Sequence, residues 1–125
     1  MRKSYMPLVY SCSGCSSAAQ TANAIVLRMD REQVAEMSCI AGVGGDVKSL
    51  VKTAKSGRSI IAIDGCSLSC SKNCLARHGV GVDSYHVLSD YSVPKLKGKD
   101  PNPDLLEQAY KQIMVDLHEE NLVIR

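Results

Sequence analysis

Cysteines in three short segments are the residues of this sequence best suited to chemistry. Residues 11–17 read SCSGCSS and contain a Cys-x-x-Cys pair. The six cysteines of the chain are Cys12, Cys15, Cys39, Cys66, Cys70 and Cys74. Thiolates bind Zn²⁺ or an iron–sulfur cluster, and a close pair also serves as a dithiol redox site. The Cys-x-x-Cys spacing is common to all three kinds of site, but a second pair at Cys66 and Cys70 favours metal binding.

The elements that must position these cysteines alternate along the chain. Predicted strands are short apolar runs, at residues 7–11, 34–40, 59–64 and 83–89. Predicted helices carry apolar residues at helical spacing, at residues 16–30, 47–54, 67–79 and from about Pro103 onward. Residues 41–46 and 93–103 are expected as loops, with Asp46 as the cap of the helix that follows it. This alternation predicts an α/β fold: a single three-layer, Rossmann-like domain over residues 1–125, with a mostly parallel sheet of about four strands and helices on both faces.

Five of the six cysteines fall where predicted strands end. In a parallel sheet all strand carboxyl ends share one edge, and open α/β folds bind ligands there. We therefore expect five thiols at that edge, which are Cys12, Cys15, Cys39, Cys66 and Cys70. Helices that begin at the same edge carry partial positive charge at their amino ends, which is expected to lower thiol pKa values. Cys74 lies a turn deeper in its helix, where it is either a further ligand or a small buried apolar residue.

Three motifs in order resemble a known family. The segments CSGCSS, AEMSCIAGVGGD and AIDGCSLSC are similar to those of the DGC-domain proteins, whose name refers to the signature that is here Asp64, Gly65 and Cys66. The resemblance covers about residues 7–80. It implies a cysteine-bound metal ion, zinc, at the five cysteines of the expected edge. Ser67 stands where family members often carry proline, and serine can cap the helix instead.

The composition of the chain argues against binding to nucleic acid and against a membrane-spanning segment. The net charge is only +2 and the chain has neither Phe nor Trp, so a base-stacking surface for nucleic acid is not expected. No apolar run approaches the roughly 20 residues that span a bilayer. The apolar run near the start is also too short for a secretion signal, so a cytoplasmic location and reduced thiols are expected.

Other motifs give weaker signals. Residues 42–46, GVGGD, lack the last glycine of a nucleotide-binding loop and the lysine of a P-loop. The three histidines share no spacing with the cysteines, and His78 is expected at a helix carboxyl end. Asp64 either braces its loop or orients the site.

The sequence thus predicts a small cytoplasmic protein that holds a metal ion through thiolates, with zinc as the expected cofactor and metal or sulfur handling as a potential role. Two alternatives remain open at this point. One is a thiol–disulfide oxidoreductase that uses Cys12 and Cys15, and the other is an iron–sulfur electron-transfer module. No reaction, substrate or oligomeric state follows from the residues.

Overall fold

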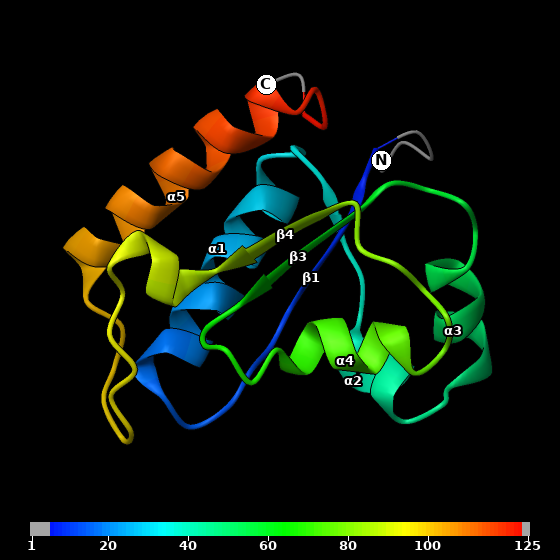
Figure 1. Ribbon diagram of the computed structural model, residues 1–125, viewed down its shortest axis with the longest axis horizontal. Coiled ribbons are helices and arrows are strands. Elements are labelled where there is room, and N and C mark those ends of the chain that lie inside the picture. The colour runs from blue at the N-terminus through cyan, green and yellow to red at the C-terminus, as the bar shows by residue number, and fades with distance from the viewer. Residues whose placement is uncertain (1–5, 124–125) are drawn as a thin grey trace.

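A computed structural model describes residues 6–123, which form a four-stranded parallel sheet with helices on both faces (Figure 1). The strands are β1 (Leu8–Ser11), β2 (Glu36–Met37), β3 (Ile60–Asp64) and β4 (Ser84–Val87). The helices are α1 (Ser17–Arg31), α2 (Ile40–Gly44), α3 (Lys48–Ala54), α4 (Cys70–Ala76), the 3₁₀ turn η1 (Leu88–Tyr91) and α5 (Pro103–Glu119). The order across the sheet is β2-β1-β3-β4 and every pairing is parallel. The predicted α/β fold is confirmed.

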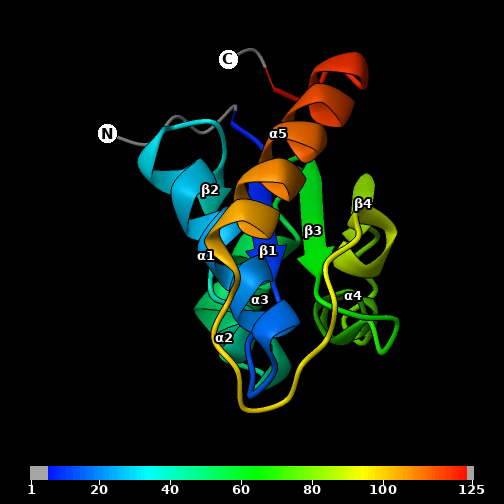
Figure 2. The same cartoon turned by 90° about the vertical axis from the view of Figure 1, so that its left-hand side faces the viewer.

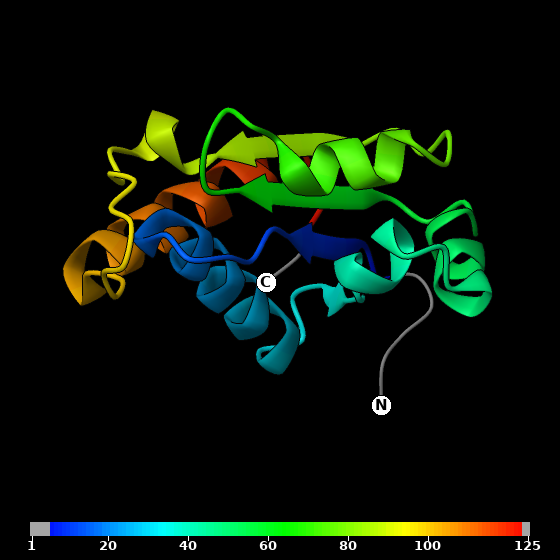
Figure 3. The same cartoon turned by 90° about the horizontal axis from the view of Figure 1, so that it is seen from below.

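The sheet separates two apolar cores. Helices α1 and α5 cover one face, and α2, α3 and α4 lie on the other (Figures 1 and 3). Side chains alternate along β3, so Ile61 and Ile63 face the first core while Ile60 and Ala62 face the second. A strand that is covered on both sides has no polar face, which explains the continuous apolar run at residues 60–63.

The pairing register of the parallel strands brings their carboxyl ends into line. Leu8 to Ser11 of β1 pair in order with Ile60 to Ile63 of β3, and β3 continues in register with β4 up to the pair Asp64 and Val87. The carboxyl ends of the strands therefore lie along one edge. None of the described helices is long and apolar enough to cross a membrane.

The segment between β2 and α3 differs from the sequence prediction. The second strand ends at Met37, and residues 40–44 form α2 where a loop was expected. Val43 is buried in the core beneath α4, and this burial holds the short helix in place. Asp46 has a φ of 64° and does not cap α3, whose N-cap residue is Val47; the predicted cap was wrong. The Asp46 carboxylate instead pairs with Arg77 and His78.

The helix after β3 is shorter than predicted. It begins at Cys70, after Ser69 in the left-handed region with a φ of 57°, and ends at Ala76. His78 lies just beyond this helix, with its Nε2 atom 2.9 Å from the carbonyl oxygen of Val43.

Candidate functional site

The carboxyl edge of the sheet carries the five predicted cysteines, and we call it the thiol edge. Cys12 follows β1 directly, Cys39 is the N-cap residue of α2, and Cys70 is the first residue of α4. Cys15 lies in the turn from β1 to α1, and Cys66 lies two residues beyond β3. All are free thiols, with Cys12 and Cys66 partly buried and the other three exposed.

Cys12 is the thiol most tightly built into this edge. The backbone N–H of Gly65 donates a hydrogen bond to Cys12 Sγ, with a donor–acceptor distance of 3.2 Å. A negative charge on Cys70 would raise the pKa of both Cys12 and Cys74, so the sulfur atoms of these residues lie close enough to interact. Cys74 lies one turn along α4 from Cys70 and faces α2, where its sulfur would lie 3.1 Å from a Cβ atom at Gly44.

The thiols nevertheless do not form a preassembled metal site. Across residues 6–123, no three histidine, cysteine, aspartate or glutamate side chains converge closely enough to hold a metal ion. The sheet brings the thiols to a common edge, and the loops leave them spread along it.

The Cys12 thiol is less acidic than expected. Burial raises the pKa of the Cys12 thiol to about 11, and the charges of Asp64 and Cys70 act in the same direction. The hydrogen bond from Gly65 lowers this pKa without offsetting the burial. Burial likewise raises the pKa of Cys74. The predicted lowering by helix amino ends is therefore wrong for Cys12, because removing the thiolate from water outweighs those dipoles.

Asp64 fixes the start of α4. Its carboxylate accepts hydrogen bonds from the backbone N–H groups of Ser71 (3.0 Å) and Lys72 (3.3 Å). The Tyr85 hydroxyl donates a third bond, at 2.8 Å. An acceptor that binds two helix N–H groups acts as a cap, although this one comes from the end of a strand. Asp64 therefore sets the position of the first turn of α4, and with it Cys70.

Gly65 lets the Asp-Gly-Cys loop touch α1 directly. A Cβ atom at this position would lie 2.7 Å from the backbone carbon of Ala18 and 2.8 Å from the nitrogen of Ala19. Only glycine permits this approach without displacing a helix backbone. In the signature, aspartate thus caps α4, glycine packs on α1, and Cys66 follows at the edge.

The loop between η1 and α5 also reaches the site, which the sequence analysis did not foresee. Leu96 exchanges hydrogen bonds with Ser17, and the Gly98 N–H donates to the carbonyl of Cys15 at 3.1 Å. Figure 2 shows this loop passing the first turns of α1. It places Lys95 Nζ 3.4 Å from Cys66 Sγ, which brings a cation to the thiol edge. Nothing in the local sequence links Lys95 to a cysteine 29 positions earlier.

The fold and the thiol edge define the class of this protein. It is a small parallel α/β domain in which cysteines that follow separate strands lie at one edge of the sheet. The sequence matches the DGC domain over residues 8–113, and the chain belongs to that family. It is 52% identical over 108 residues to the anaerobic and virulence modulator AnvM of Pseudomonas aeruginosa strain PAO1, in an alignment that covers 86% of this chain and 82% of that protein. No solved structure matches the chain significantly.

Proposed function

We propose that this protein binds one zinc ion through four of the five thiols of the thiol edge. The observation that carries the proposal is topological. A fully parallel sheet sets cysteines that follow β1, β2 and β3 at one edge, and the N–H of Gly65 already points at the sulfur of Cys12. Sulfur ligands from separate segments suit tetrahedral zinc.

The surroundings of these thiols fit a zinc–thiolate group. Four thiolates around Zn²⁺ leave a net charge of about −2. Helices α1, α2 and α4 begin at the same edge, and the Lys95 ammonium lies beside Cys66. The N–H to sulfur bond at Cys12 is of the kind that supports a ligating thiolate. Bound zinc would act as a Lewis acid if one position stayed open, and as a structural or stored ion if all four were filled.

Two features weigh on the alternatives. A dithiol redox pair needs only Cys12 and Cys15, and it would not require the further thiols of Cys39, Cys66 and Cys70 at the same edge. AnvM is named a modulator, which supports a regulatory use of the metal over a metabolic reaction. A cytoplasmic location would keep the six thiols reduced and available.

The test is metal analysis after anaerobic purification. We expect a colourless protein with about one zinc per chain, and a loss of at least half of that zinc in both Cys12→Ser and Cys66→Ser. Cys74→Ser is the matched control, since Cys74 is a thiol of the same helix as Cys70 outside the proposed set, and it should keep its zinc.

Other outcomes reject the proposal. Full zinc content in both edge variants would mean that the two segments share no centre. A brown, iron-containing protein would indicate an iron–sulfur cluster. A metal-free protein with a reversible Cys12–Cys15 disulfide would indicate a redox pair.

A further inference from the structure

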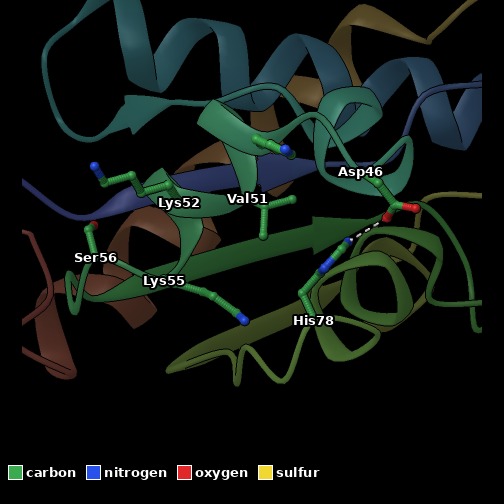
Figure 4. A pocket seen from close by; sticks show the side chains of 7 residues that line it. Asp46, Val51, Lys52, Lys55, Ser56 and His78 are labelled. Carbon is green, nitrogen blue, oxygen red and sulfur yellow. Dashed lines mark ion pairs between the residues drawn. The ribbon is translucent and has the colours of Figure 1, made fainter.

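A second site lies at the other end of α4, away from the thiol edge. It is a pocket of about 540 Å³ between α3 and the residues that follow α4 (Figure 4). The side chains that set its chemistry are Asp46, Lys48, Val51, Lys52, Lys55 and His78. Helix α4 has seven residues, so roughly 10 Å of helix separates Cys70 at its start from this pocket.

Two lysines on α3 and the C-cap residue of that helix, Lys55, give the pocket its positive charge. Lys48 and Lys52 lie four positions apart on one face of α3, and Lys55 follows as the C-cap residue of that helix. Val51 lines the same pocket. Figure 4 shows Lys55 extending towards His78, which comes from the opposite wall. All three lysines are exposed, and none of them forms an ion pair within the described part of the chain.

The acidic residue that lines the pocket does not neutralise these lysines. The Asp46 carboxylate lies 2.7 Å from Arg77 Nη2 and 3.0 Å from His78 Nε2, so it is already paired. Like charges at this helical spacing repel and destabilise a helix. The pocket is thus lined by three exposed cations that have no anionic partner among the described residues, and a bound anion would attract all three.

We propose that this pocket binds a small organic anion that carries at least two phosphate groups. Lysine ammonium groups bind phosphate as point charges. One phosphate carries about −1.5 to −2 charge at neutral pH, so two of them match three lysines. The volume lies within the range of small-molecule pockets, and Val51 offers an apolar surface for the organic part. This site uses none of the cysteines and goes beyond the proposed zinc function.

The experiment titrates inorganic pyrophosphate into the full chain and follows backbone amide shifts at low salt. We expect saturable shifts at residues 48–56. The affinity should fall about tenfold in Lys52→Gln, which removes one charge-assisted contact. Lys99→Gln is the matched control: it makes the same charge change in the loop before α5, on the opposite side of the molecule (Figure 1). Its affinity should equal that of the wild type.

Three results would overturn the assignment. One is the absence of shifts at residues 48–56, including shifts confined to the cysteine segment 66–74. Another is an equal loss of affinity in both lysine variants, which would indicate only general attraction to a cationic surface. The third is binding of citrate as tight as that of pyrophosphate, which would indicate a carboxylate ligand. Because Lys52 is exposed, its variant should unfold at the wild-type temperature, so a folding defect does not obscure the result.

Discussion

Replacing Gly65 with alanine tests the close contact between the Asp-Gly-Cys loop and α1. The new Cβ would meet three backbone atoms of Ala18 and Ala19 at 2.7 to 2.8 Å. Ordinary carbon contacts begin near 3.5 Å, so the loop or the helix must move by about 0.7 Å. Neither neighbour is a flexible side chain that can rotate away. Forcing such an overlap into packed structure costs about 2–3 kcal/mol.

The same displacement weakens the hydrogen bond from Gly65 to Cys12, because the donor belongs to the residue that moves. For a domain of this size, we expect the midpoint of thermal unfolding to fall by about 10 °C. Circular dichroism with a metal chelator present measures the effect without a contribution from bound metal. Gly81→Ala is the control, since among residues 6–123, its own two chain neighbours aside, no atom lies within 4 Å of the place its methyl group would take, and the change should be neutral or slightly stabilising. Equal midpoints for the two variants would refute the steric reasoning.

Two further predictions concern stability. Asp64→Asn removes the charged acceptor that caps α4 and should lower the free energy of unfolding by about 1–2 kcal/mol in urea titrations, whereas Asp90→Asn at an exposed position should change it little; equal effects would deny Asp64 its capping role. Burial lowers the pKa of His86 below its ordinary value of 6.5, so between about pH 7 and pH 5.5 the unfolded chain binds more protons than the native one. Stability should therefore fall as the pH is lowered over that range, measured by thermal unfolding, and that of His86→Gln should fall less; identical slopes would contradict the assignment.

Elements with a strong local signal were predictable from sequence. The helical spacing of Ala18, Ala22 and Ile25 predicted α1, and the apolar run of residues 60–63 predicted β3. The last helix was expected from about Pro103, and α5 begins there, with the side chain of Asn102 as its cap. Helix α2 has no such signal, since five residues with two glycines are too short to form a helix alone. Its stability comes from Val43 in the core, which is a tertiary contact.

The site was predictable to the level of topology. Cysteines after strands had to lie at one edge once the sheet was parallel, and the structure places them there. Distances between thiols depend on loop conformations that no periodicity encodes. The approach of Lys95 to Cys66 and the burial of Cys12 both arise from chain segments distant in sequence. For this reason the predicted direction of the Cys12 pKa shift was wrong, whereas the predicted place of Cys12 at the edge of the sheet was right.

The shortness of β2 has a consequence for how molecules of this protein meet one another. An exposed edge strand offers unpaired backbone groups to which a strand of another chain can add, and long, flat edges promote aggregation. Within the part of the chain that the structure describes, β2 makes only the pairs Leu8 with Glu36 and Val9 with Met37. One of its two residues, Glu36, is charged, and its Oε1 atom lies 2.8 Å from Nη1 of Arg58. An edge of this length provides too few backbone partners to seed a growing intermolecular sheet, so this side of the fold is protected against fibril formation.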